Sequence, residues 1–265
     1  MDKDTLDPTK SRPDLVPAGA FTYPVTAPNP TRWFAFLLLP GFTLHAFSAA
    51  LDPLRIANQL AQKPLYGWQV LSETGGAVSS SSGIDIGVHA ALSDVATETY
   101  LFVCSGNNGT KVASQGVLAS IRRHARFGGK AGGICTGAAT LARAGLLDGR
   151  TFTLHWENQP GFVETFPQLE PSRHRVERDG DLLTCGGGVA ATEMMVSVIA
   201  KDYGEDFAIA RHICGLSKAK GGLHLRTGLK RSETFHQTVR QEFPKASMPC
   251  ASKAATIHKM LRGVP

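Results

Sequence analysis

Residues 130–157, KAGGICTGAATLARAGLLDGRTFTLHWE, decide the fold expected for this chain of 265 residues. The small residues 131–134 predict the end of a buried strand, and the run from Thr136 predicts a helix that ends at Gly145. Cys135 therefore falls on a sharp strand-to-helix turn, a nucleophile elbow, where glycine and alanine let the backbone reverse without a clash. Because such a turn places the sulfur beside a helix N-terminus, we expect it to favour the thiolate.

A histidine follows Cys135 after twenty residues. The β-branched and apolar residues 151–156 predict a strand with His155 near its end. A cysteine with a base nearby can be catalytic, so Cys135 and His155 form a candidate pair. Two other interpretations stay open, because a buried cysteine is often only a small apolar residue and a lone histidine is often a hydrogen-bonded packing residue.

The chain outside this stretch alternates apolar runs with amphipathic segments. We predict strands at 34–39, 68–72, 99–104 and 130–134, and helices over 47–60 and 115–126. Strands alternating with helices are typical of an α/β three-layer sandwich with a mainly parallel sheet. Sites in such sheets form at the carboxyl ends of strands, and this is where Pro40-Gly41, Cys104-Ser105-Gly106, Cys135 and His155 fall. We therefore predict a pocket at that edge.

Four segments resemble, in this order, the ThiJ/PfpI superfamily of class I glutamine-amidotransferase-like domains and, more closely, the sensor domain of GlxA-type AraC-family transcription regulators. They are FAFLLLPGFTLHAFSAALDPLRIANQLA (34–61), LFVCSGNN (101–108), GGICTGAATLARAGLLDGRTFTLHWE (132–157) and LLTCGGGVAATEMMVSVIAKDYG (182–204). The resemblance implies a flavodoxin-like fold, a homodimer, and a ligand-sensing domain of a transcription regulator. The superfamily holds hydrolases, hydratases and non-catalytic sensors on one scaffold, so its fold alone does not decide function.

The same resemblance implies roles for single residues. It matches His155 to the family's histidine and the Ser105-Gly106 loop to the donors of an oxyanion hole. In the family's enzymes an acid hydrogen-bonds the cysteine, and the matching position here is Ala46. Because alanine offers no carboxylate, we expect binding without turnover rather than the alternative, a cysteine-dependent hydrolase or hydratase similar to isocyanide hydratase that uses Cys135 and His155.

Regulators of this group respond to small amines, so the resemblance implies betaine, carnitine or an amino-acid-like amine as the effector. The expected ligand-binding residues are Cys135, Thr136, His155, Trp156, Ser105, Gly106 and Phe42. Aromatic faces such as Trp156 and Phe42 suit quaternary ammonium by cation–π attraction, and Glu157 offers a countercharge. Core packing explains each aromatic residue equally well, and Glu157 is also explained as a surface residue.

The sequence indicates neither a metal nor a nucleotide cofactor. The five cysteines, 104, 135, 185, 214 and 250, lack CxxC spacing, and neither GxGxxG nor GxxxxGK occurs. Unpaired cysteines suit a reducing cytoplasm, where we expect the protein. The first 32 residues lack an apolar stretch of signal-peptide length, and no membrane partner is expected.

Composition and charge predict three parts. Residues 1–32 are rich in Pro, Asp and Thr and predict a flexible arm, 33–210 the sensing domain, and 211–265 a basic tail. From Arg211 onward eleven Lys and Arg face two acids, a net +9; the whole chain carries +6, so residues 1–210 carry −3. A basic unit suits DNA, the partner that the resemblance implies.

The tail itself does not resemble the family's pair of helix-turn-helix units. Only 55 residues follow Ala210, and they lack sustained helical spacing of apolar residues. We predict that 211–265 is not a complete helix-turn-helix domain, which makes DNA binding by this chain doubtful. Two explanations stay open: a departure from the ancestral reading frame after Ala210, or a naturally short form with a solvated basic tail.

Overall fold

One seven-stranded sheet organises the described part of the chain. The computed structural model describes residues 15–19, 22–25, 30–107, 109 and 111–208, so the predicted tail 211–265 and most of the predicted arm 1–32 lie outside the described residues. The strand order is β5-β2-β1-β6-β7-β9-β8, with β1 (Arg32–Leu38), β2 (Tyr66–Ser72), β5 (Ala90–Ala91), β6 (Tyr100–Cys104), β7 (Ala131–Ile134), β8 (Val176–Asp179) and β9 (Leu182–Cys185). Every neighbouring pair is parallel except β8 with β9, which confirms the predicted mainly parallel sheet.

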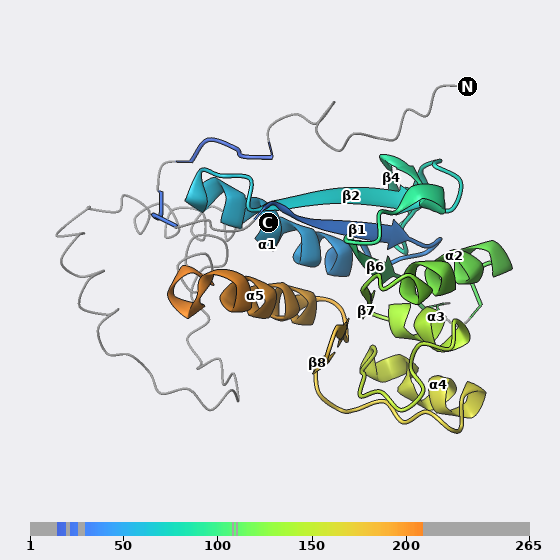
Figure 1. Cartoon of the computed structure of the whole chain (residues 1–265). Helices are drawn as coiled ribbons and strands as arrows, with labels where there is room; N and C mark the ends of the chain where they lie inside the picture. The colour runs from blue at the N-terminus through green and yellow to red at the C-terminus, as the bar shows by residue number, and fades with distance from the viewer. Residues whose placement is uncertain (1–14, 20–21, 26–29, 108, 110, 209–265) are drawn as a thin grey trace, which may run out of the picture. The chain divides into compact units, whose positions relative to one another are not determined.

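Helices cover both faces of this sheet (Figure 1). One face carries α1 (Leu44–Ala61) and α5 (Val189–Tyr203), and the other carries α2 (Gln115–Arg126), α3 (Gly137–Arg143) and α4 (Gln159–Thr165). Short elements complete the list: β3 (Val78–Ser79) pairs with β4 (Asp85–Ile86), and 3₁₀ turns form η1 (Leu92–Asp94) and η2 (Trp156–Asn158). The predicted flavodoxin-like three-layer sandwich is confirmed. Of the helices described here, none is both long and apolar enough to cross a membrane.

Strand β1 shows why the sheet needs helices on both sides. Side chains alternate across a strand, so Phe34, Phe36 and Leu38 enter the core with α1 and α5, while residues 35, 37 and 39 enter the core with α2 and α3. Both sets are buried. A continuous apolar run is the pattern of a strand that is buried on both faces, which is why it can be predicted from the sequence.

Helix α1 contains a proline that removes one backbone hydrogen bond, and the neighbouring helix α5 supplies a replacement. Pro53 lies inside the helix and has no N–H, so the carbonyl of Ala49, four residues earlier, loses its helical donor. The hydroxyl of Thr192 on α5 donates a hydrogen bond to this carbonyl at 3.0 Å. The pairing of α1 with α5 is therefore fixed by a specific polar contact as well as by apolar packing.

A polar cluster lies at the C-terminal end of α5. Arg32, at the start of β1, forms an ion pair with Asp202 at 2.8 Å, and the Tyr66 hydroxyl donates to the same carboxylate at 3.2 Å. Burial, and then the charge of Asp202, raise the pKa of Tyr66 well above its usual range. The last turn of α5 is thus tied to the first residues of β1 and β2.

Two pieces of the predicted arm contact α1. The Tyr23 N–H donates to the Leu60 carbonyl at 2.7 Å, and the Tyr23 ring packs on Phe207 with centroids 5.5 Å apart. In the other piece, the Leu15 carbonyl accepts a hydrogen bond from Asn58 at 3.0 Å. The flexibility predicted for 1–32 as a whole stays a prediction.

The strand predicted at 151–156 does not form, and that prediction is wrong. The Thr153 N–H donates to the Thr184 side chain at 2.9 Å rather than to a strand backbone, and the Thr153 hydroxyl donates to the His174 carbonyl at 2.7 Å. The edge position beside β9 is taken by β8, an antiparallel strand that the sequence analysis missed. Side-chain hydrogen bonds thus replace the ladder that apolar and β-branched residues would otherwise favour.

Candidate functional site

Cys135 lies directly after β7, at the carboxyl edge of the sheet. Its φ is +59°, which is uncommon for a residue other than glycine. The Cys135 N–H donates to the Cys185 carbonyl at 3.0 Å, and the Cys135 carbonyl accepts from the His155 N–H at 3.3 Å. The predicted strand-to-helix turn is present, and its backbone is held from both sides; a nucleophilic role for the sulfur stays a prediction.

Two glycines allow backbone segments to pack closely against one another around this turn. A Cβ added at Gly137, the first residue of α3, would lie 2.0 Å from the Val103 carbonyl oxygen of β6. A Cβ added at Gly187 would lie 2.9 Å from the Cβ of Cys135 and 3.3 Å from its sulfur, and Gly187 also has a φ of +83°. Helix α3 can therefore approach β6, and the loop before α5 can approach Cys135, only because these two residues lack side chains.

The thiol of Cys135 is buried, and this overturns the expectation that the turn favours the thiolate. The residue is only 5 % exposed. Burial raises the pKa of Cys135, and hydrogen bonds from the Thr43 side chain and the Thr136 backbone lower it by less than burial raises it. Burial therefore outweighs the two hydrogen bonds that favour the thiolate.

The position matched to the family's acid offers the thiol no polar partner. Ala46 is buried in α1 and packs in the same apolar core as Cys135. The hydroxyl of Thr43, the N-cap residue of α1, instead hydrogen-bonds the sulfur at 3.5 Å. Sequence reasoning missed Thr43 because it looked for a carboxylate, and a threonine before a helix is ordinarily explained as a cap.

The raised pKa predicts slow alkylation of Cys135. Iodoacetamide reacts with the thiolate, so the labelling rate of the Cys135 peptide, followed by mass spectrometry, should keep rising with pH beyond the ordinary cysteine value of 9.0. Thr43→Val removes a hydrogen bond that lowers the pKa, and we expect labelling at pH 8 to slow by roughly threefold. Thr165→Val, an exposed control on α4, should leave the rate unchanged; a rate that levels off below pH 8 would contradict the prediction.

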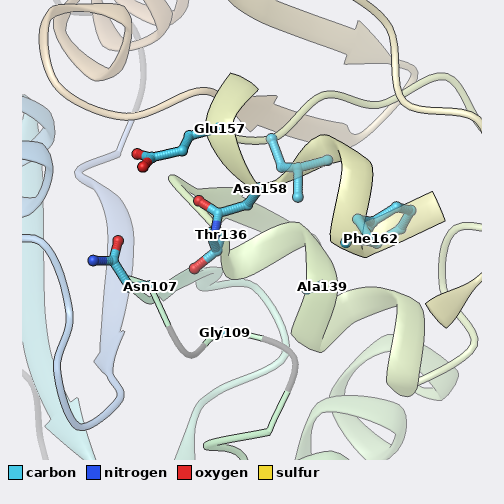
Figure 2. A pocket seen from close by; sticks show the side chains of 9 residues that line it. Asn107, Gly109, Thr136, Ala139, Glu157, Asn158 and Phe162 are labelled. Atoms are coloured by element: carbon cyan, nitrogen blue, oxygen red, sulfur yellow. The ribbon is translucent and has the colours of Figure 1, made fainter. Parts of the chain in front are cut away.

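A cavity of about 220 Å³ lies beside this turn (Figure 2). Its polar wall is formed by Asn107, Thr136, Glu157 and Asn158, and its apolar wall by Ala139, Leu154 and Phe162, with Gly109 and Gly161 between them. The residues come from the loop after β6, from α3, and from the segment through η2 into α4. In Figure 2 the side chains of Asn107, Glu157 and Asn158 extend toward a common open space, while Phe162 lies on the far side.

Thr136 is the predicted ligand-binding residue that lines this cavity. Its hydroxyl donates a hydrogen bond to the Gly106 carbonyl, which ties the turn at Cys135 to the loop after β6. Ser105 in the same loop is buried, and its hydroxyl has no hydrogen-bond partner among the described residues. Thr136, Ser105, Gly106 and Cys135 are thus brought together as predicted, and their contact with a ligand stays a prediction.

The other predicted ligand-binding residues lie apart from the cavity. Phe42 is fully buried and packs edge-on against Phe47, with ring centroids 5.9 Å apart. Trp156 is 75 % exposed, and its ring packs at a tilt on His155. The side chain of His155 is 30 % exposed, with Nδ1 4.0 Å from the Glu157 carboxylate. Core packing therefore accounts for Phe42, and Trp156 lies at the surface.

The cavity residues that the sequence analysis missed include Asn107, Asn158 and Phe162. Asn107 was quoted within a family segment, but nothing in the local pattern distinguishes it from an ordinary turn residue. Asn158 lies two residues before Pro160, a pattern that indicates a helix start rather than a binding residue. These residues meet only in three dimensions. Within the described part of the chain, no three His, Cys, Asp or Glu side chains are grouped so that they could hold a metal ion.

Comparison with known proteins agrees with this architecture. The profile of the DJ-1/PfpI family matches residues 53–201. The chain is 45 % identical over 174 residues to the HTH-type transcriptional regulator GlxA of Rhizobium meliloti (strain 1021), covering 65 % of this chain and 54 % of that protein. It is 40 % identical over 176 residues to the HTH-type transcriptional regulator CdhR of Pseudomonas aeruginosa, covering 66 % and 52 %. The chain therefore spans about half the length of these curated relatives.

A solved structure is similar over the same region. The crystal structure of an AraC family transcriptional regulator from Pseudomonas putida superimposes with a TM-score of 0.63 at 26 % sequence identity. The superposition covers 70 % of this chain and 99 % of that one. The similarity thus extends through the sheet and helices described above.

Proposed function

The chain belongs to the DJ-1/PfpI family, and from that premise we propose that residues 33–210 are the small-molecule-sensing domain of an AraC-type, GlxA-like transcription regulator. The domain binds its effector in the cavity beside Cys135 without chemical turnover. The observation that carries this proposal is the cavity itself, with polar side chains on one wall next to a thiol that is buried and lacks a carboxylate partner at position 46. The regulators GlxA and CdhR support the same assignment.

The surroundings of the thiol favour binding over catalysis. A nucleophilic cysteine needs a base or a lowered pKa, and burial here raises the pKa of Cys135. The side chain that hydrogen-bonds the sulfur is the Thr43 hydroxyl, which is no base near neutral pH. Without an activated thiolate, the alternative function as a cysteine-dependent hydratase or hydrolase lacks its first step.

The effector class follows from the charge at the cavity. Glu157 contributes a carboxylate to the polar wall, so a cationic ligand is favoured there. Betaine, carnitine and amino-acid-like amines each carry a cationic nitrogen of this kind. The HTH-type regulators GlxA and CdhR support DNA as a partner of the regulator type, although residues 211–265 are predicted not to form a complete helix-turn-helix domain. A homodimer and a cytoplasmic location are carried over from the family resemblance and complete the proposal.

Ligand-observed NMR tests binding against turnover. Pools of betaines, carnitine, amino acids, isocyanides and α-oxoaldehydes are followed over hours with the wild-type chain and with Cys135→Ala. Broadening of a compound's signals by both proteins, with no new signals, would support the sensor. A product that grows with the wild type and not with Cys135→Ala would overturn it and make Cys135 a nucleophile.

A substitution that fills the cavity should abolish binding without unfolding the domain. Gly161 lines the cavity, and a Cβ added there meets nothing within 4 Å. We expect Gly161→Leu to weaken binding of any compound found by NMR at least about tenfold, because its side chain occupies ligand space. Stability should be unchanged or higher, since leucine favours helix more than glycine does. Val163→Leu, an exposed change on the same helix, is the control; full binding by Gly161→Leu would place the ligand elsewhere.

A further inference from the structure

The polar wall of the cavity distinguishes between two kinds of cation. We infer that the effector is a cation that carries N–H groups, such as a protonated primary or secondary amine or a guanidinium, and not a quaternary ammonium. This inference rests on the proposed sensing function and selects among the amines considered there. It is carried by an unpartnered acceptor on Asn158, by the Glu157 carboxylate, and by the positions of the aromatic rings.

Asn158 is the N-cap residue of α4, yet its side chain does not cap the helix. An N-cap oxygen ordinarily accepts from the N–H of the second or third helical residue, and here the second is Pro160, which has no N–H. The side-chain oxygen Oδ1 is buried and has no hydrogen-bond partner among the described residues. Because a buried acceptor without a donor is costly, Oδ1 would gain from an N–H donor that a ligand brings to the Asn158 side of the cavity.

Glu157 adds negative charge on the same wall. Its side chain is mostly exposed, and it extends toward the space that Asn107 and Asn158 also face (Figure 2). An ammonium group between Glu157 and Asn158 would donate one N–H to the amide oxygen and another to the carboxylate. Such charge-assisted hydrogen bonds are stronger than neutral ones. A trimethylammonium group has the charge but no N–H to donate.

The aromatic rings do not form a cage for a quaternary ammonium. Recognition by cation–π attraction needs ring faces directed at the ligand. Phe42 is buried in the core and Trp156 lies at the surface. Phe162 lines the cavity, but its ring already packs against Phe152 and Phe166, with centroids 5.5 and 5.0 Å away. A trimethylated head group would therefore lose the hydrogen bonds without gaining an aromatic enclosure.

The dimensions of the cavity limit the rest of the ligand. Its volume of about 220 Å³ lies below the usual range for sites that hold drug-sized molecules. Ala139, Leu154 and Phe162 supply the apolar part of the lining, which suits a short aliphatic part of the ligand. The predicted ligand is therefore a small aliphatic amine or amino acid with its nitrogen at Asn158 and Glu157.

Matched pairs of probes test this inference with the full chain. Glycine is compared with glycine betaine, γ-aminobutyrate with γ-butyrobetaine, and n-butylammonium with n-butyltrimethylammonium, so that only the N-methyl groups differ. Dissociation constants are measured by ligand-observed NMR titration. We expect the N–H member of at least one pair to bind about tenfold more tightly than its trimethyl partner. Equal or tighter binding of the trimethyl members would overturn the inference and leave the sensing function standing.

Three substitutions and one control variant connect the preference for N–H ligands to particular residues. Asn158→Leu should bring the ratio of the two dissociation constants within a probe pair close to one. Asn158→Asp keeps the acceptor and adds a charge, so it should preserve or raise the preference for the N–H probe. Glu157→Gln should weaken binding of the N–H probes, and Glu164→Gln, the same change at an exposed position of α4, should not. A preference that survives Asn158→Leu unchanged would overturn the assigned role of Asn158. If folded wild-type protein bound neither member of any pair, both the inference and the sensing function would be overturned.

Discussion

Replacing Gly137 by alanine is expected to lower the free energy of unfolding by about 3 kcal/mol or more. The added Cβ would lie 2.0 Å from the Val103 carbonyl oxygen and 3.0 Å from its carbonyl carbon. These are backbone atoms of β6, which is hydrogen-bonded to β1 on one side and β7 on the other, so they cannot swing away as the end of a side chain would. Helix α3 would have to shift, and the turn at Cys135 with it.

Urea denaturation followed by circular dichroism would measure this loss as a lower midpoint. Gly161→Ala is the matched control, because a Cβ at Gly161 meets nothing within 4 Å. It should leave stability unchanged or raise it by up to about 1 kcal/mol, the usual gain from glycine to alanine in a helix. A Gly137→Ala midpoint equal to that of the wild type would show that α3 does not approach β6 as closely as described.

Asn58→Leu is expected to destabilise the domain by about 3 kcal/mol, although the two side chains are similar in size. Asn58 is fully buried on α1. Its oxygen accepts from the Tyr66 N–H at 2.9 Å, and its amide group donates to the Tyr66 carbonyl at 2.7 Å. One side chain thus pairs both backbone groups of the first residue of β2, as a neighbouring strand would, and leucine would leave both buried without these partners.

The midpoint of thermal or urea unfolding reports this effect as well. Asn107→Leu makes the same chemical change at an exposed asparagine, and its effect on stability should stay within about 0.5 kcal/mol. If Asn58→Leu were no more harmful than Asn107→Leu, the hydrogen bonds to Tyr66 would contribute little to stability.

The elements that the sequence predicts well are those with a strong local pattern. Helix α2 spans Gln115–Arg126, the range predicted from its amphipathic spacing, and the Ser114 hydroxyl caps it by accepting from the Val117 N–H. Strand β1 is likewise predictable from a local pattern, its continuous apolar run. By contrast, Thr151–Trp156 has a β-favouring composition, and the hydrogen bonds of Thr153 to distant residues decide its conformation instead. Composition does not reveal partners that lie far away along the chain.

The candidate site was predictable only in part for the same reason. Cys135 and its turn are visible in a short motif, because small residues on both sides are a local requirement. The partner of the thiol, Thr43, and the unpartnered oxygen of Asn158 are not visible in this way. Their roles arise because the loop after β1 and the segment around η2, which lie far apart in the sequence, come together near one edge of the sheet. The family pattern gives the location of the site, and only the three-dimensional arrangement gives its hydrogen-bonding character.

Helix α5 has a mechanical consequence through its two ends. It begins two residues after Gly187, which lies close to Cys135, and its last turn contains Asp202 of the Arg32–Asp202 ion pair. Its fifteen residues form a strut about 22 Å long, with the Thr192 hydrogen bond to α1 along its length. A helix of this length is stiff along its axis, so it passes a displacement from one end to the other. A displacement of the loop at Cys135 is therefore expected to reach Asp202, at the other end of α5.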